Sequence, residues 1–519
     1  MNGAMMNATS RFAIAAAFGL VMGVSSARAA DLGGNCCADL EERVAELEAT
    51  TARKGNRKMS LTITGQVHKM ILWWDDGLQS KTFYGLENRN SSTRFSILGD
   101  AKVTADIKVG FEIMMDNQGG TSAQIRQWDP NGKSNGLITP IAAPSFAGNN
   151  DDSYFGAARR MVIWVEDAKL GRMTVGHYEM AGAITTIDLA GISAGASASM
   201  SLVNGAFFLR GPAGQYYAAS WANFMDPAAN QSRHNEVRYD SPAYMGFIYS
   251  ASIADDGSNW GTMLRYANEF NGLRVAAGIG YEHYGQVTAQ ANCFGVNTFP
   301  PPGTISACAN TGSVPGVNGP GFGPANQAGP APDVNAWGAG LSFLHVPSGL
   351  FVQGHYIHVD YNEFEPTTPG PGNSWWGQDV QGRTPADQWL IQGGVSKNWF
   401  GIGNTAIFGE YSRSEGWGAA GGPLSPTGRS FSNAVFPGAT SVFGIHDTEV
   451  TMYGVGITQI VDAAVTEFYL DWRHFSADIT CSSTGVNCTG AAAPVGTVAS
   501  QKLQTEDFWA VIGGARLKF

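Results

Sequence analysis

Apolar and polar residues alternate along much of the chain from residue 59 to its end. In "LRVAAGIGYE", Leu273, Val275 and Ile279 fall on one side of an extended strand, and Arg274 and Glu282 fall on the other. The same period of two recurs in "LTITGQV", "RFSILGDAKV" and "IKVGFEIMM". These segments are predicted to be strands with one apolar face and one polar face.

Sixteen segments of this kind can be counted, and their connections alternate in length. One set of connections is short; the other set, except for 254–259, is long and rich in Gly, Pro, Asn and Ser. The segments are expected near 60–73, 92–103, 107–116, 157–167, 170–178, 235–241, 246–253, 260–268, 273–282, 336–345, 350–360, 388–397, 404–412, 449–458, 465–475 and 506–519.

This alternation is typical of an up-and-down barrel that crosses a membrane, with short turns on one side and long loops on the other. Strands can cross hydrocarbon only when every backbone hydrogen bond is made within the protein, so the sheet must close on itself. We therefore predict an all-β fold, a 16-stranded antiparallel transmembrane β-barrel over 59–519, with short periplasmic turns and long external loops. The alternative is a secreted multi-domain β protein whose apolar faces are buried in a core.

The last segment, "DFWAVIGGARLKF", has the same alternation. Trp509, Leu517 and Phe519 lie on its uncharged face, and Arg516 lies on the other. We expect this strand to close the barrel by pairing with the first strand near Leu61. Its uncharged face would then meet lipid, and its charged face would meet the lumen.

Composition supports a surface that does not face water. Charged residues make up only 14% of the chain, aromatic residues make up 11%, and there are 67 glycines. The net charge of −11 and the lack of a Lys/Arg-rich run indicate that nucleic acid is not a partner.

The N-terminal residues predict export. "FAIAAAFGLVMGV" is an apolar run too short to span a bilayer, and "SSARA" after it offers an A-x-A cleavage site, so 1–29 is expected to be a secretory signal peptide. In the linker 30–58, Leu40, Val44 and Leu47 step by four and three as in a coiled coil. A short trimeric coil in the periplasm and a frayed helical linker both remain open for it.

Four of the six cysteines form two local pairs in predicted loops. An oxidising compartment could close each pair as a disulfide, and free loop thiols are the alternative. The pairs are Cys293 with Cys308 and Cys481 with Cys488. The neighbours Cys36 and Cys37 follow "LGGN", which does not resemble a lipoprotein acylation signal.

Several stretches together resemble alphaproteobacterial (rhizobial-type) outer-membrane porins. They are "GLVMGVSSARAADLGGNCCADLEERVAELEATTARKGNRKMSLTITGQV", "STRF", "LGRMTVGH", "HNEVRYDSP", "YGVGITQIVDAA", "YLDWRHFSAD" and "GGARLKF". The resemblance covers most of the chain but not the loops 283–335 and 413–448. It implies a homotrimeric porin in the outer membrane of a Gram-negative bacterium, in contact with outer-membrane lipid and lipopolysaccharide, through which small hydrophilic solutes diffuse passively.

The resemblance also implies an inward-folded constriction loop and an assembly signal. In such porins the loop after the fifth strand enters the lumen; here it would begin near Glu179 and include Asp188. Whether 206–224 lies inside the lumen is left open. The terminal Phe519, with Leu517 and Trp509 before it, resembles the signal that the barrel assembly machinery recognises.

Strand parity nominates the charges that face the lumen. They lie opposite apolar residues on the predicted strands, and a basic wall facing Glu179 and Asp188 would create a transverse field across the constriction. The alternative is a polar ladder near the rim that does not act on solutes. The nominated residues are Arg94, Arg172, Arg238, Arg265, Arg274, Arg473, Arg516, Glu112, Glu236, Asp240, Glu282, Glu467 and Asp471.

Nine tryptophans lie at or near predicted strand ends, where an interfacial aromatic girdle is expected. A sugar-stacking track is the other interpretation. The nine are Trp73, Trp74, Trp164, Trp260, Trp337, Trp389, Trp399, Trp472 and Trp509.

The sequence contains no pattern that predicts an enzyme. A Walker A loop and a zinc-type Cys/His cluster are both missing from it. His355 and His358 are three apart on a predicted strand, so they face opposite sides and do not form a metal site. We therefore predict a general porin without cofactor or metal; the alternative is a channel selective for a sugar or a small anion.

Overall fold

The computed structural model describes most of the chain from residue 59 onward. No helix in this part of the chain is long and apolar enough to cross a membrane. The residues described are 59–117, 120–123, 125–129, 157–183, 186–195, 201–212, 214, 216–225, 233–255, 257–284, 333–362, 385–416, 430–432, 442–484 and 498–519.

Some predictions concern residues outside these ranges. They are the signal peptide 1–29, the linker 30–58, and Cys36, Cys37, Cys293, Cys308 and Cys488. Cys481 lies in a described strand, but its side chain is not described. The loop disulfides therefore remain predictions. Residues Ser60–Phe519 form one compact unit.

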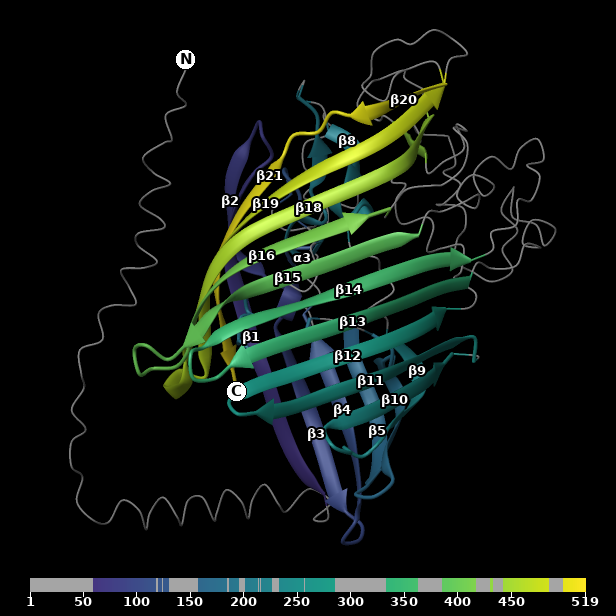
Figure 1. Ribbon diagram of the computed structural model, residues 1–519, viewed down its shortest axis with the longest axis vertical. Helices are drawn as coiled ribbons and strands as arrows, with labels where there is room; N and C mark the ends of the chain where they lie inside the picture. The colour runs from purple at the N-terminus through teal and green to yellow at the C-terminus, as the bar shows by residue number, and fades with distance from the viewer. Residues whose placement is uncertain are drawn as a thin grey trace, which may run out of the picture. The chain divides into compact units, whose positions relative to one another are not determined.

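Sixteen antiparallel strands of this unit form a closed ring, in which each strand pairs with the next and the last pairs with the first (Figure 1). This confirms the predicted barrel and all sixteen segments. The strands are β1 (Ser60–Asp75), β3 (Arg94–Lys102), β4 (Ile107–Asp116), β5 (Ala157–Asp167), β6 (Gly171–Glu179), β9 (Arg233–Asp240), β10 (Phe247–Ala254), β11 (Asn259–Phe270), β12 (Leu273–Tyr284), β13 (Asp333–His345), β14 (Leu350–Asn362), β15 (Ala386–Lys397), β16 (Thr405–Glu415), β18 (Val442–Val461), β19 (Thr466–Thr484) and β21 (Phe508–Lys518).

The ring closes between β21 and β1. Val67 lies opposite Leu517 and Trp73 lies opposite Val511, so the pairing runs along the second half of β1. The predicted closure near Leu61 was placed too early, because Leu61 pairs with β3 instead. The terminal residue still takes part: Gly65 N donates to Phe519 O at 2.9 Å, and Phe519 N donates to Gly65 O at 3.0 Å.

The short connections lie at one end of the strands. Between β11 and β12 the turn is Asn271-Gly272, and both residues have positive φ, 50° and 80°. Two positive φ angles define a type I′ turn, which matches the twist of paired strands and favours Asn-Gly. The connections β13–β14, β15–β16 and β18–β19 span only 346–349, 398–404 and 462–465, the last with the short helix η5 (Asp462–Ala464).

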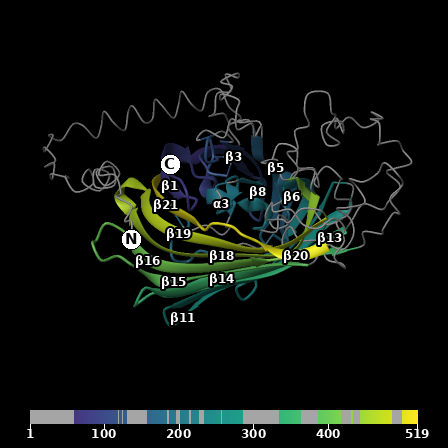
Figure 2. The same ribbon diagram turned by 90° about the horizontal axis from the view of Figure 1, so that it is seen from above.

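Smaller elements extend the wall or lie inside the ring. The strands β2 (Ser80–Glu87), β17 (Ser430–Ser432) and β20 (Val498–Leu503) pair with β1, β18 and β19. Between β6 and β9 the chain forms α3 (Ser201–Asn204), the hairpin of β7 (Phe208–Arg210) and β8 (Tyr216–Ser220), and η2 (Trp221–Asn223). Figure 2 shows α3 and β8 between β3 and β5 on one side and β18 and β19 on the other.

Side chains on the ring strands alternate between an exposed outer face and a buried inner face. On β1, Val67 and Ile71 are exposed while His68 and Leu72 are buried. Tryptophans form a row on the outer face from β11 to β21; Trp337, for example, packs against Tyr356 with ring centroids 5.1 Å apart. The other members of this aromatic row are Trp260, Trp389, Trp472 and Trp509 with Tyr281, Tyr411, Tyr453, His283, His358 and His474.

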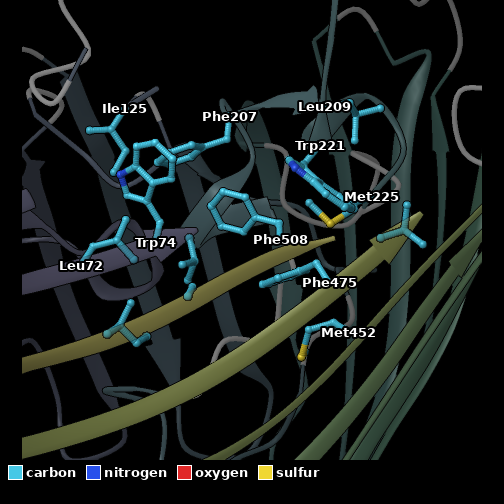
Figure 3. Packing of buried hydrophobic residues seen from close by; sticks show 14 of the residues in the cluster. Leu72, Trp74, Ile125, Phe207, Leu209, Trp221, Met225, Met452, Phe475 and Phe508 are labelled. Carbon is cyan, nitrogen blue, oxygen red and sulfur yellow. The ribbon is translucent and has the colours of Figure 1, made fainter. Parts of the chain in front are cut away.

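Part of the inner face is apolar, which the sequence pattern did not predict. Inward side chains of β1, β18, β19 and β21 pack against the segment between β6 and β9 (Figure 3). Phe207 of that segment contacts Trp74 at 5.2 Å and Phe508 at 4.9 Å, and Trp221 contacts Phe475 at 6.1 Å between ring centroids. Residues 206–212 and 221–225 therefore lie against the inner wall.

Two tryptophans predicted for the interfacial girdle face inward instead. Trp74 is fully buried among Phe83, Phe207 and Phe508. Trp164 shares the inner face of β5 with Val162, and the guanidinium carbon of Arg172 lies 4.4 Å from its ring centroid. Closeness to a strand end was a poor guide here, because parity decides which face a side chain joins.

Candidate functional site

The segment after β6 runs along the inner wall of the barrel. Its backbone and side chains contact inward residues of one strand after another, so it lies inside the ring. The contacts are Ala181 N to Ser252 Oγ of β10 at 2.9 Å, Thr186 Oγ1 to His355 Nδ1 of β14 at 2.6 Å, Ser396 Oγ of β15 to Ala190 O at 2.7 Å, Arg473 Nη2 of β19 to Gly195 O at 3.1 Å, and Arg516 Nη2 of β21 to Ser193 Oγ at 3.2 Å.

The start of this segment approaches the wall very closely. A Cβ atom on Gly182 would lie 2.1 Å from Tyr281 O of β12, so only glycine fits there. At its far end the segment meets η1 (Arg89–Ser91), where Asn90 Nδ2 donates to Ser193 O at 2.9 Å. The predicted inward-folded loop thus follows the wall from β10 to β21. The inner faces of β3 to β9 lie next to it.

Asp188 holds the shape of this loop. Its Oδ1 accepts hydrogen bonds from the N–H groups of Ala190 and Gly191, at 3.0 and 2.8 Å, and its Oδ2 accepts one from Ser193 N at 2.8 Å. A carboxylate that satisfies three backbone donors stabilises a local turn. Asp188 therefore stabilises the fold of the loop through these three backbone hydrogen bonds.

Five arginines gather at the loop-side ends of β3, β5 and β9 and in η1. We call Arg89, Arg94, Arg159, Arg160 and Arg233 the arginine cluster. Sequence parity nominated only Arg94 among them. Arg159 and Arg160 are neighbours in β5, and a regular strand would turn one of them outward.

A β-bulge in β5 brings both neighbours to the inner side. Met114 pairs with Arg160 and Met115 pairs with Ala158, so Arg159 is the extra residue. Arg159 Nη1 then reaches Asp116 Oδ2 at 3.1 Å, and Arg160 Nε reaches Glu179 Oε2 at 2.8 Å. The two adjacent arginines were the feature of the sequence that indicated this bulge. In a regular strand one of them would face the apolar outer side, which is costly, and a bulge avoids that cost.

Three carboxylates of the described part of the chain lie among these arginines. Asp116 also pairs with Arg89, with Oδ2 and Nη1 3.5 Å apart, and Glu179 also pairs with Arg233, with Oε1 and Nε 3.0 Å apart. Glu112 Oε1 lies 3.4 Å from Arg160 Nη1. Glu179 thus belongs to the basic wall itself and does not face it from the opposite side.

The predicted arginines farther along the wall form a second group. Asp240 Oδ1 accepts from Arg238 Nη2 and from Arg265 Nη2, both at 2.9 Å. Arg238 also packs on the Tyr178 ring at 5.4 Å. Together with Arg172 over Trp164, these residues give the inner face of β5 to β11 a ladder of cations and aromatic rings.

The predicted arginines Arg473 and Arg274 lie elsewhere. Arg473 is buried under the loop, where its Nε donates to Glu410 Oε1 at 2.6 Å and its Nη2 lies 2.9 Å from Asp471 Oδ2 as an ion pair. Arg274 pairs with Glu269 at 2.9 Å near the short turn between β11 and β12, and about half of each side chain is exposed. The structure therefore brings Arg94, Arg172, Arg238 and Arg265 to one wall and separates Arg473 and Arg274 from it.

The remaining residues nominated from the sequence lie on β9, β12, β19 and β21. Arg516 Nε donates to Glu467 Oε2 at 2.6 Å, and Arg516 is buried. Glu236 and Glu282 are buried on β9 and β12. Trp509 and Leu517 lie on the outer face of β21, and the exposed ring of Phe519 lies over Gly65.

No protein-family model and no curated relative matches the sequence. Solved barrels resemble the chain weakly. An anion-selective porin from Comamonas acidovorans is 13% identical, with 89% of this chain and 100% of that chain covered and a TM-score of 0.45. A loop-deletion form of OmpT, an outer membrane protein of Vibrio cholerae, is 11% identical, with 89% of this chain and 100% of that chain covered and a TM-score of 0.45. OprB of Pseudomonas putida is 7% identical, with 93% of this chain and 97% of that chain covered and a TM-score of 0.42. Similarity at this level establishes neither a family nor a function.

Proposed function

We propose that the chain forms a water-filled channel in the bacterial outer membrane, through which small hydrophilic solutes and ions diffuse passively. The observation that carries this proposal is the closed ring of sixteen strands with exposed apolar residues outside and ion pairs inside. About sixteen strands enclose a lumen wider than side chains alone can fill. The rhizobial-type porin resemblance of the sequence supports the same function.

The outer face supports placement in a membrane. Exposed aliphatic side chains cover it, among them Ile63, Ile163 and Ile279, and the tryptophans of the aromatic row suit the boundary between lipid and water. The proposal includes contact with outer-membrane lipid and lipopolysaccharide, and assembly by the barrel assembly machinery through the strand that ends in Phe519. It assigns no residue a catalytic role.

We extend the proposal to a homotrimer in which β3 to β6 face the other copies. The described outward residues of these four strands include neither Trp nor Tyr, so the aromatic row is interrupted there. Beside this sector, Lys69 projects outward from β1 and pairs with Glu87 at 2.9 Å. A lysine on a lipid-facing surface is unfavourable, and burial against another copy removes that cost.

Single-channel recording in planar bilayers tests the proposal. The purified protein should produce stepwise ohmic currents in KCl, and protein that inserts without conducting would rule out a pore. Saturable block by one sugar at low concentration would favour the alternative, a substrate-selective channel. For the trimer, electrophoresis without boiling should show an SDS-resistant high-mass band that heat converts to monomer.

A further inference from the structure

The arginine cluster contains more positive than negative charge. Among the described residues, its five arginines face three carboxylates, Glu112, Asp116 and Glu179, so the difference, 5 − 3, is an excess of two positive charges. The pairs are only partly covered: the exposed fractions of the paired arginine side chains run from 20% for Arg233 to 29% for Arg89. A solute in the lumen can therefore reach them.

Arg94 lies opposite Asp116 of β4, but it is the member for which no ion pair within 4 Å is found among the described residues. Its Nη2 lies 3.4 Å from Ser91 Oγ, and the same hydroxyl accepts from Arg516 Nη1 at 2.7 Å. The charges within electrostatic range of Arg94 are the cations Arg159, Arg160 and Arg516 and a single anion, Asp116. Repulsion between guanidinium groups that share one region is relieved when an anion binds among them.

Geometry, as well as charge, favours an oxyanion. Guanidinium groups present planar pairs of N–H donors that match the oxygens of phosphate and carboxylate groups. The bulge turns Arg159 to the same side of β5 as Arg160, and Ser193 of the inward loop contacts Asn90 of η1 and Arg516 next to Ser91.

We propose that the arginine cluster binds a small dianionic oxyanion, such as phosphate or a short dicarboxylate, during its passage through the channel. This inference rests on the proposed function and names the solute class that its site prefers. The two uncompensated charges match one dianion. Arg94 supplies the donors that no carboxylate of the described chain occupies.

Inorganic phosphate is the probe that tests this inference. At pH 8 and constant ionic strength, phosphate should reduce the KCl current of the native channel in a saturable way. Arg94→Gln should raise the half-blocking concentration by about tenfold, because one charge-assisted contact is lost. Arg94→Lys should recover part of the block, and Lys397→Gln, at the short-turn end of β15, should behave as the native chain does.

Calorimetric titration of the detergent-solubilised native chain with phosphate separates failure of the inference from failure of the channel. Normal KCl currents without phosphate block would overturn the inference and leave the channel intact. Equal block in the native chain and in Arg94→Gln would overturn the role of Arg94. Phosphate binding that Arg94→Gln weakens, in a protein that does not conduct, would support the site and contradict the channel.

Discussion

Arg473 of β19 and Glu410 of β16 form a buried ion pair on the inner wall of the barrel, with Nε and Oε1 2.6 Å apart. Arg473 also donates to Gly195 O, so the pair holds the far end of the inward loop. Gln392 Nε2 donates to the second oxygen of Glu410 at 3.0 Å. This network therefore connects β15, β16 and β19 to the loop.

Arg473→Met should destabilise the protein strongly. Removing one partner of a buried pair leaves Glu410 and Asp471 buried without their cation, which costs about 3–5 kcal/mol. Arg274→Met is the matched control, because an exposed pair such as Arg274–Glu269 contributes about 0–1 kcal/mol. Urea unfolding in lipid vesicles measures both variants, and an equal loss of stability in the two would contradict the role of this network.

Trp221→Ala should loosen the inward loop. Its ring is buried between Phe475 and Phe508, and truncation of a buried aromatic residue costs about 3–5 kcal/mol. We expect noisier single-channel currents, because the loop is then held less firmly against the wall and its position in the lumen fluctuates. Leu78→Ala changes an exposed residue of the β1–β2 turn and should leave the currents unchanged. Currents of native size and noise in Trp221→Ala would show that the apolar contacts do not set the opening.

The sequence predicted the strands well because period-two alternation is a local property. The expected segments 273–282 and 107–116 match β12 and β4 closely. The loop-side extension of β18 and β19 beyond the expected 449–458 and 465–475 was missed, since residues there need not meet an apolar environment on either face.

The inner apolar packing and the arginine cluster were harder to predict. The inward ring of Trp74 is buried because Phe207 covers it, and these residues are far apart in the chain. Arg159 joins the inner face only through the bulge opposite Met114 and Met115. Neither the remote contact nor the bulge follows from alternation within one strand.

Two outward isoleucines allow the proposed interface between copies to be distinguished from the lipid-facing surface. Ile163 of β5 and Ile279 of β12 are 65% and 55% exposed, so an arginine fits sterically at either position. Ile163→Arg should abolish the SDS-resistant high-mass band on unboiled gels. Ile279→Arg should lower folding yield, since a lipid-facing arginine costs about 2–4 kcal/mol at mid-bilayer, but the folded fraction should keep the band. A band that survives Ile163→Arg would place the interface elsewhere.

Deletion of Phe519 should impair assembly far more than channel properties. The residue makes two backbone hydrogen bonds with Gly65 at the seam, yet it lies at the end of the strand, away from the arginine cluster. Phe400→Ala alters an exposed phenylalanine of a short turn and serves as the control. Surface labelling of intact cells measures assembly, and native surface levels of the deletion variant would disprove the assembly signal.

Leu264 and Arg265 of β11 allow the most direct test of a water-filled lumen. They are neighbours with almost equal exposure, 43% for Leu264 and 42% for the side chain of Arg265, but they face opposite sides of the wall. Leu264→Cys and Arg265→Cys are each treated with a charged, membrane-impermeant thiosulfonate during single-channel recording, with the native chain treated in parallel. We predict a stepwise change in current for Arg265→Cys alone. A change for Leu264→Cys alone, or for neither variant, would contradict the channel.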